Sequence, residues 1–314
     1  MDQWVPFWPT NAALSASIVD TINIGEFALI GLILLFVTGM TLVFCVRYRR
    51  GSPAPRQPLG SSSWRLEIAW TAATLAAFFV LFVFGANAYL FLYRPPPRTD
   101  LEVYIVGKQW MWKVQHPGGQ REIDALHVPV DRTVRVVLAS EDVIHSFFIP
   151  SFRLKHDVVP GQFETFWFRP TRTGEYKLEC SEFCGVQHAH MIGTVTVMSA
   201  ADYARWLSDQ GVAESLSQQG AALFRSYGCS GCHDPHATVH APLLTGLYGR
   251  VVQLQDGRAV RADERYIRDC ILTPLNQIVA GYPPVMPSFA GQMSEEDLIR
   301  IVAYIKSLSA GSSS

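Results

Sequence analysis

Two long apolar segments occupy the first third of the sequence, and they restrict its fold more than any other feature. Residues 24–46 carry one charged side chain, Glu26, and residues 68–93 carry none. A helix needs about 20 consecutive apolar residues to cross the hydrocarbon core of a bilayer. Both segments reach that length, so we expect them to form two membrane-spanning helices. A pair of long helices buried inside a soluble domain is the alternative.

The segment between the two apolar runs is strongly basic. Residues 47–65 hold five arginines and no acidic residue, whereas residues 1–46 hold no lysine or arginine. Basic loops of membrane proteins stay on the cytoplasmic side. The pattern therefore predicts a helical hairpin whose N-terminus, together with the whole chain after Tyr93, lies outside the cytoplasm.

The chain after the second apolar segment divides into regions of different pattern. Three consecutive prolines end the predicted helix, so residues 1–98 are expected to form an N-terminal segment and the hairpin. Residues 99–199 contain short runs rich in β-branched and aromatic residues between Pro and Gly turns, which is typical of an all-β sandwich or barrel. Residues 200–219, which begin with a helical stretch and continue rich in Ser and Gln, are predicted to be a linker. Residues 220–314 alternate helical patterns with loops and are expected to be all-α.

A cysteine motif in the last region indicates a covalently bound cofactor. Cys229 and Cys232 are followed by His233 in a Cys-x-x-Cys-His sequence, in which two thioethers attach a c-type haem and the histidine binds its iron. A redox dithiol or a zinc site uses the same cysteine spacing. A redox dithiol needs a strand–helix context. A zinc site needs another pair of ligands, and the sequence lacks that pair.

The iron of such a haem requires a sixth ligand. We predict Met286, because neighbouring prolines make a rigid loop that can fix a thioether. A Met/His pair also raises the reduction potential, as electron transfer requires. Met293, which opens the last helical pattern, His236 and His240 are the alternatives.

A second set of metal-binding residue types is concentrated near the end of the predicted sandwich. Its members are Cys180, Cys184, His188 and Met191, with His145 earlier in the sequence. Thiolates, imidazoles and a thioether favour copper over hard cations such as magnesium or calcium. A Cys180–Cys184 disulfide is the alternative, but it leaves His188 and Met191 without a role.

Together these motifs resemble subunit II of cytochrome c oxidases, in the branch whose subunit II carries a fused cytochrome c. The resemblance implies a cupredoxin-like sandwich that holds the dinuclear copper centre called CuA, followed by a c-type cytochrome domain. In this set the two thiolates bridge both coppers, each of two imidazoles binds one copper, the thioether is a weak ligand and a glutamate donates its backbone carbonyl. The implied copper ligands are His145, Cys180, Glu182, Cys184, His188 and Met191.

The resemblance implies roles for further residues. Trp110 matches the aromatic residue that passes electrons into CuA, and Trp112 is either a second such residue or a half-buried strand tryptophan. Glu67, at the start of the second apolar segment, resembles the glutamate at the mouth of a proton uptake pathway, although an interfacial acid that reaches water fits equally well. The side chain of Glu182 resembles a magnesium ligand at a subunit interface.

The function implied by the resemblance is a relay of electrons from a periplasmic donor through haem c to CuA. A haem-copper catalytic subunit, subunit I, then reduces oxygen to water and pumps protons. The chain would cross a bacterial inner membrane twice, in contact with lipid and other oxidase subunits. A CuA subunit of a nitric oxide reductase and a stand-alone membrane-anchored electron carrier are the alternatives.

The charge pattern says little about partners. The net charge of −1 gives no reason to expect nucleic acid. Residues 212–314 hold nine acidic and eight basic residues, a balance that predicts no strong electrostatic steering of a donor. A soluble cytochrome c and a quinol-oxidising complex are both compatible with it.

Overall fold

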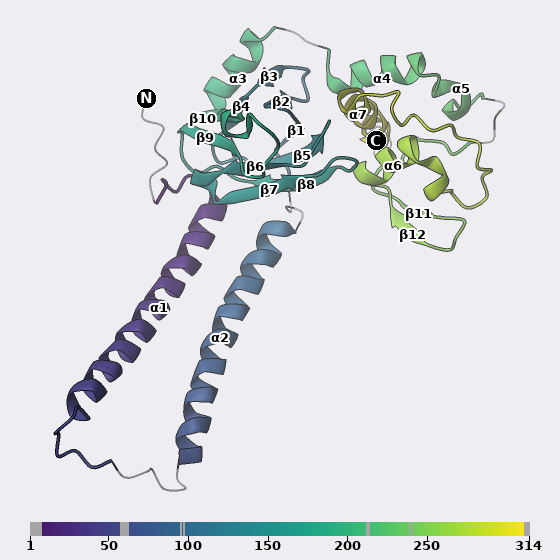
Figure 1. Cartoon of the computed structure of the whole chain (residues 1–314). Coiled ribbons are helices and arrows are strands. Elements are labelled where there is room, and N and C mark those ends of the chain that lie inside the picture. The colour runs from purple at the N-terminus through teal and green to yellow at the C-terminus, as the bar shows by residue number, and fades with distance from the viewer. Residues whose placement is uncertain are drawn as a thin grey trace. The chain divides into compact units, whose positions relative to one another are not determined.

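The computed structural model describes residues 8–56, 63–94, 96, 98–211, 214–237, 239 and 241–310. They divide into two compact units, of which one is Ser15–Arg94 and the other combines the segment before it with the chain after it (Figure 1).

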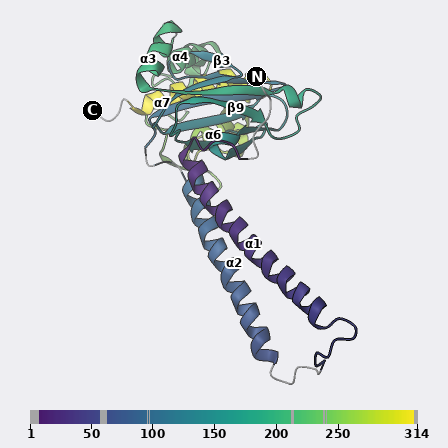
Figure 2. The same ribbon diagram turned by 90° about the vertical axis from the view of Figure 1, so that its left-hand side faces the viewer.

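The first unit consists of two long helices, α1 (Leu14–Arg47) and α2 (Ser63–Tyr93). Figures 1 and 2 show both as continuous rods. Among the described residues these are the two helices that are long and apolar enough to cross a membrane, and their most apolar stretches are not buried within the protein. Because an exposed apolar surface of this length needs lipid around it, the helices form the expected two-helix membrane anchor. Each helix contains the predicted span and begins several residues before it.

The second unit begins with a β-sandwich. In the described part of the chain it has two five-stranded sheets, in the orders β3-β2-β1-β5-β8 and β4-β10-β9-β6-β7. The strands are β1 (Leu101–Lys108), β2 (Met111–Gln115), β3 (Arg121–Ile123), β4 (Ala125–Pro129), β5 (Val134–Ser140), β6 (His145–Ile149), β7 (Leu154–Val158), β8 (Glu164–Phe168), β9 (Gly174–Cys180) and β10 (Ile192–Met198). The all-β prediction for this region is confirmed.

Strands β1 and β5 are apolar on both faces. They pair in parallel, with Val103 opposite Val136 and Tyr104 opposite Val137. Val103 and Val136 point into the core between the sheets, whereas Tyr104 and Val137 belong to a second buried cluster. A strand that is buried on both faces needs cover on both. The outer cover of this sheet comes from the helices that follow the sandwich.

These helices form the helical domain, residues 216–310. Its elements are α4 (Leu216–Ser226), α5 (Ser230–His233), β11 (Val251–Gln253), β12 (Ala259–Arg261), α6 (Glu264–Leu272), η3 (Pro274–Asn276) and α7 (Glu295–Ala310). A Cβ atom on Gly220 of α4 would lie 1.9 Å from the carbonyl oxygen of Arg300 in α7. The close packing of these two helices therefore requires glycine at this position.

The region between the sandwich and the helical domain is largely helical. Helix α3 (Ala200–Asp209) is capped at its N-terminus by Ser199, whose side chain accepts a hydrogen bond from the backbone N–H of Asp202. Ser215 and Gln218 form a capping box that starts α4 at Leu216. The range 200–219, which we expected to be a linker, thus contains one whole helix and the first turn of another.

Candidate functional site

The four side chains with the strongest metal-binding chemistry converge at one end of the sandwich. Cys180 ends β9 and His145 begins β6, and these strands are neighbours in one sheet. The Sγ atoms of Cys180 and Cys184 lie 3.7 Å apart. Nδ1 of His145 lies 4.0 Å from Sγ of Cys180, and Nδ1 of His188 lies 3.5 Å from Sγ of Cys184.

Two further donors complete the group. Sδ of Met191 lies 3.8 Å from Sγ of Cys184, and the backbone oxygen of Glu182 lies 3.2 Å from Sγ of Cys180. The structure therefore brings together all six residues that the resemblance implied as copper ligands. A disulfide would place the sulfur atoms about 2.05 Å apart, whereas two thiolates on one metal lie about 3.8 Å apart. The sulfur spacing and the soft donor set both fit copper.

The acidity of the two thiols is linked. Burial raises the pKa of Cys180, but hydrogen bonds from His145 and backbone amides outweigh it and lower that pKa below its ordinary value. Burial raises the pKa of Cys184, and a negative charge on Cys180 raises it further. The pocket thus favours one thiolate on its own, and a bound cation would be needed to favour the second.

A carboxylate orients the first imidazole. Nε2 of His145 lies 2.8 Å from Oδ1 of Asp142, and the backbone N–H of Gln109 donates to Oδ2 of Asp142 at 2.8 Å. This leaves Nδ1 of His145 facing the sulfur atoms. Histidine ligands are commonly oriented by such a carboxylate. Asp142 and Gln109 were missed in the sequence, where the only signal was an acid three residues before His145.

The two tryptophans differ in their position at this site. The indole N–H of Trp110 donates to the carbonyl of Cys184 at 3.3 Å, next to the Gln109 amide, which donates to the same oxygen at 2.7 Å. Trp112 is fully buried, and its ring centroid lies 6.0 Å from that of His145. Trp110 therefore contacts the metal-binding loop directly, whereas Trp112 belongs to the core beneath it.

The backbone at Gly185 allows this approach. Its φ is +119°, and a Cβ atom there would lie 2.9 Å from Nε2 of Gln109 and 3.3 Å from the ring of Trp110. Only glycine combines this conformation with such close neighbours. Gly185 therefore allows the loop after Cys184 to pack against Trp110.

Three other residues considered from the sequence lie at the surface. The side chain of Glu182 is exposed, as is that of His190, for which we assigned no role. Glu67 is exposed near the start of α2. Neither glutamate side chain belongs to the group of donor atoms around Cys180 and Cys184.

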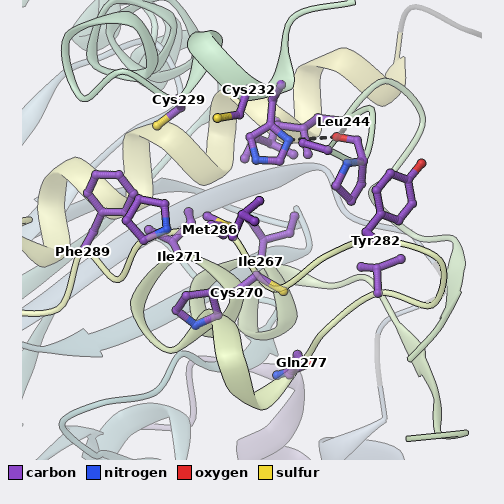
Figure 3. Close-up of a pocket in the computed structure, with 18 of the residues that line it drawn as sticks. Cys229, Cys232, Leu244, Ile267, Cys270, Ile271, Gln277, Tyr282, Met286 and Phe289 are labelled. Atoms are coloured by element: carbon purple, nitrogen blue, oxygen red, sulfur yellow. Dashed lines mark hydrogen bonds between the residues drawn. The ribbon is translucent and has the colours of Figure 1, made fainter. Parts of the chain in front are cut away.

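A second site is an apolar cavity in the helical domain. Cys229, Cys232, His233 and Met286 all line it. Figure 3 shows Cys229 and Cys232 along one side and Met286 across the cavity from them. Apolar side chains form most of the remaining wall, including Phe224, Leu244, Leu247, Ile267, Ile271, Phe289, Ile301 and Ile305.

The donor groups of this cavity fit a c-type haem. Nδ1 of His233 lies 2.8 Å from the carbonyl oxygen of Pro242, a bond that leaves Nε2 available for iron. Of the candidates for the sixth ligand, the predicted Met286 lines the cavity, whereas Met293 is partly buried outside its wall and His236 is exposed. His240 lies outside the described residues.

One cysteine of this cavity was not assigned from the sequence. Cys270 lines it from α6, and burial raises the pKa of its thiol to about 11. The thiol therefore stays protonated and packs as a small apolar group.

Comparisons with known proteins match the two domains in which these sites lie. The family model described as "Cytochrome C oxidase subunit II, periplasmic domain" matches residues 103–198, and the one described as "Cytochrome c" matches residues 217–309.

Two similar proteins cover most of the chain. The alternative cytochrome c oxidase subunit 2 of Bradyrhizobium diazoefficiens is 31% identical over an alignment of 261 positions, which covers 71% of this chain and 91% of that protein. A cytochrome c oxidase subunit 2 of Alkalihalophilus pseudofirmus is 29% identical over an alignment of 296 positions, which covers 88% of this chain and 83% of that protein. A crystal structure of the periplasmic domain of subunit II of cytochrome oxidase from Bradyrhizobium japonicum matches with 31% identity and a TM-score of 0.35, covering 36% of this chain and 95% of that one.

Proposed function

Because the chain belongs to the cytochrome c oxidase subunit II family and carries a cytochrome c domain, we propose that it is the subunit at which electrons enter an oxygen-reducing oxidase. The helical domain accepts electrons from a periplasmic donor, and the sandwich passes them to the catalytic haem-copper subunit I. That partner reduces oxygen to water and pumps protons. A soluble cytochrome c or a quinol-oxidising complex is the donor. Both soluble domains lie on the periplasmic side of a bacterial inner membrane.

The convergence of six donor groups at the end of the sandwich carries the proposal. Cys180 and Cys184 would hold the copper ions through their thiolates, and His145 and His188 through their imidazoles. When bound, such a centre supplies one-electron transfer. The buried ligands, together with the Asp142 carboxylate behind His145, keep the donor atoms fixed, so little rearrangement accompanies a change of charge.

The cavity in the helical domain supports the second half of the relay. Cys229 and Cys232 would attach a haem through thioethers, and His233 and Met286 would bind its iron. When bound, that haem supplies one-electron transfer at a potential that the Met/His pair raises. The apolar wall excludes water, and the Pro242 carbonyl holds the His233 ring in position.

We propose Trp110 as the residue through which electrons approach the copper ligands. Its contact with the Cys184 carbonyl supports this role. Trp112 fits better as a core residue, because it is fully buried and packs edge-on against Phe147.

Two exposed glutamates complete the proposal. The Glu182 side chain is free to reach a magnesium ion at an interface with the catalytic subunit while its carbonyl faces Cys180. We propose that Glu67, exposed near the start of α2 and next to the basic loop, begins a proton uptake pathway from the cytoplasm. Replacing Glu67 by Gln should lower proton uptake while electron input continues. Unchanged proton pumping would leave Glu67 as an interfacial acid.

The function is tested by purifying the full chain in detergent with its bound partners. We expect a multi-span haem-copper subunit to copurify and to reduce oxygen. Cys180→Ser should stop oxygen uptake while the c-type haem is still reduced by donor. Cys45→Ser, an exposed position in α1, is the matched control and should leave uptake unchanged. A chain that copurifies with a nitric oxide-reducing subunit, or with no catalytic subunit, would overturn the oxidase assignment.

A further inference from the structure

The sandwich and the helical domain share one buried apolar cluster. From the outer face of β1 and β5 it includes Tyr104, Val106, Val137 and Ala139, each at most 3% exposed. From the helical domain it includes residues of α4, α6 and α7. The sheet face would lose its cover if the helical domain left it, and burial of apolar surface favours the docked state.

A cluster of four charged side chains lies within this interface. Two come from the sandwich, Glu102 of β1 and Arg135 of β5, and two from the helical domain, Glu264 of α6 and Lys306 of α7. Arg135 donates two hydrogen bonds to Glu264, at 2.8 and 3.0 Å. Lys306 donates to Glu102 at 2.6 Å and to Glu264 at 2.7 Å. Arg135 also pairs with Glu102 within the sandwich. Through the Arg135–Glu264 and Lys306–Glu102 pairs, each of the four charges contacts an opposite charge from the other domain.

The four charges are largely withdrawn from water. Their side chains are 3–21% exposed, with Glu264 at 3%. Tyr248 donates to Glu264 at 2.6 Å, and Tyr104 donates to Glu102. If only one domain's charges stayed buried, the protein would be destabilised, because a buried charge without its partner loses its hydration and has no ion pair to compensate for the loss. The cluster is therefore complete only when the two domains are docked.

A second ionic contact joins the domains near the copper ligands. Nζ of Lys113 in β2 lies 2.9 Å from Glu141 of the sandwich and 2.8 Å from Glu296 in the first turn of α7. Glu141 directly precedes Asp142, the carboxylate that orients His145. Lys113 thereby holds the start of α7 against the loop that precedes His145.

The same turn of α7 also reaches the haem cavity. Asp297, next to Glu296, accepts a hydrogen bond at 3.2 Å from Tyr227, which lines the cavity. The segment that connects the two domains also contacts the sandwich, since the backbone N–H of Leu216 donates to the carbonyl of Pro117 at 3.1 Å.

We propose that the helical domain is a fixed donor, locked on the sandwich by the Glu102–Arg135–Glu264–Lys306 cluster and by Lys113, and does not swing on its linker between an external donor and the copper site. This inference rests on the proposed function of the two sites. Arg135, Lys306 and Lys113 act as positioning residues that keep the haem cavity at one distance from the copper ligands.

The test follows internal electron transfer in the full chain within its purified oxidase. The haem is reduced by a photochemical pulse, and its reoxidation is followed as solvent viscosity and salt are varied. A fixed donor transfers electrons at a rate that depends on neither viscosity nor salt. Lys113→Met and the double change Arg135→Met with Lys306→Met should abolish part of the fast phase and make the remainder depend on viscosity. Lys113→Arg should restore the wild-type rate.

The matched control is Arg258→Met. It breaks the exposed Arg258–Asp256 ion pair, which lies within the helical domain and is 58% and 51% exposed, and it should leave the rate unchanged. Haem absorbance and copper resonance spectra must show intact centres in each variant, so that misfolding is recognised. A wild-type rate that falls as viscosity rises, or interface variants that match the control, would overturn the proposal.

Hydrogen exchange gives a readout that does not need the metal centres. Amides of β1 and β5 should be protected in the full chain and should exchange faster in the Arg135→Met, Lys306→Met protein, but not in Arg258→Met. Equal protection in all three proteins would contradict fixed docking. Failure to find copper or haem would instead contradict the proposed function and leave this result unaffected.

Discussion

Nε2 of His145 lies 2.8 Å from Oδ1 of Asp142, and this contact turns the other ring nitrogen toward the sulfur atoms of the candidate copper site. The same carboxylate accepts the backbone N–H of Gln109, so it links the metal-binding loop to the stretch that carries Trp110. Burial alone would raise the pKa of Asp142, but the Gln109 and His145 contacts lower it below its ordinary value. The carboxylate is charged when it orients the imidazole.

Replacing Asp142 by Asn should weaken copper binding without removing a ligand. Loss of a residue that orients a metal ligand typically lowers affinity by about 10- to 100-fold. Competition with a copper chelator measures the change, and Asp256→Asn, at an exposed position in the helical domain, serves as the control. Equal copper affinity in both variants would mean that Asp142 does not orient the ligand.

Replacing Met286 by Ala should leave the haem attached, because Cys229 and Cys232 are untouched, but it should change the sixth ligand. The expected sign is loss of the sulfur-to-iron absorption band in the red region. Met293→Ala removes a thioether that is partly buried against the apolar cluster and is not part of the cavity wall, so it should keep the band. If Met293→Ala loses the band and Met286→Ala keeps it, our ligand assignment is wrong.

Replacing Gly220 by Ala should destabilise the helical domain. The added methyl group would lie 1.9 Å from the Arg300 carbonyl, and overpacking of this kind costs about 1–3 kcal/mol. Denaturant unfolding followed at the haem band measures the loss. Gly39→Ala in α1 is the control, since a Cβ atom there meets nothing within 4 Å. Equal stability of the two variants would show that α4 and α7 pack less closely than described.

Acid should weaken the contact between the sandwich and the helical domain through Glu264. Burial would raise its pKa, but the positive charges of Lys306 and Arg135 lower it from an ordinary value of 4.5 to about 2. A lowered folded-state pKa gives stability that is present above pH 4.5 and is lost as the pH falls toward 2. The shift corresponds to about 3 kcal/mol.

The measurement for this prediction is the free energy of unfolding between pH 6 and pH 2, compared in the wild type and in Glu264→Gln. The variant should be less stable at pH 6 and should lose less stability on acidification. Parallel curves for the two proteins would show that Glu264 does not contribute through its charge.

Features that depend on local sequence were predictable. The two membrane helices follow from the length of uncharged sequence, and Cys229, Cys232 and His233 from one short motif. Cys180, Cys184, His188 and Met191 lie within one short stretch of sequence, so their spacing alone brings them near each other. His145 is distant in sequence, and its place in the set came from family resemblance.

Features that depend on tertiary contact could not be predicted from the chain alone. Glu102 and Lys306 lie 204 positions apart, and no periodicity relates them. Tyr104 and Val106 in β1 gave a signal, since a strand that is apolar on both faces needs two covers. The start of α4 at Leu216 was signalled by Ser215 and Gln218, but the Ser- and Gln-rich composition favoured a linker.

Electron paramagnetic resonance of the purified full chain, combined with copper and haem analysis, tests the central claim most directly. The account predicts a mixed-valence signal in which one unpaired electron is shared by two copper nuclei, together with one covalent haem per chain. Loss of the shared signal in Cys184→Ser, with the haem retained, would tie it to the described residues. A signal from a single isolated copper, or a chain that holds haem and no copper, would contradict the account.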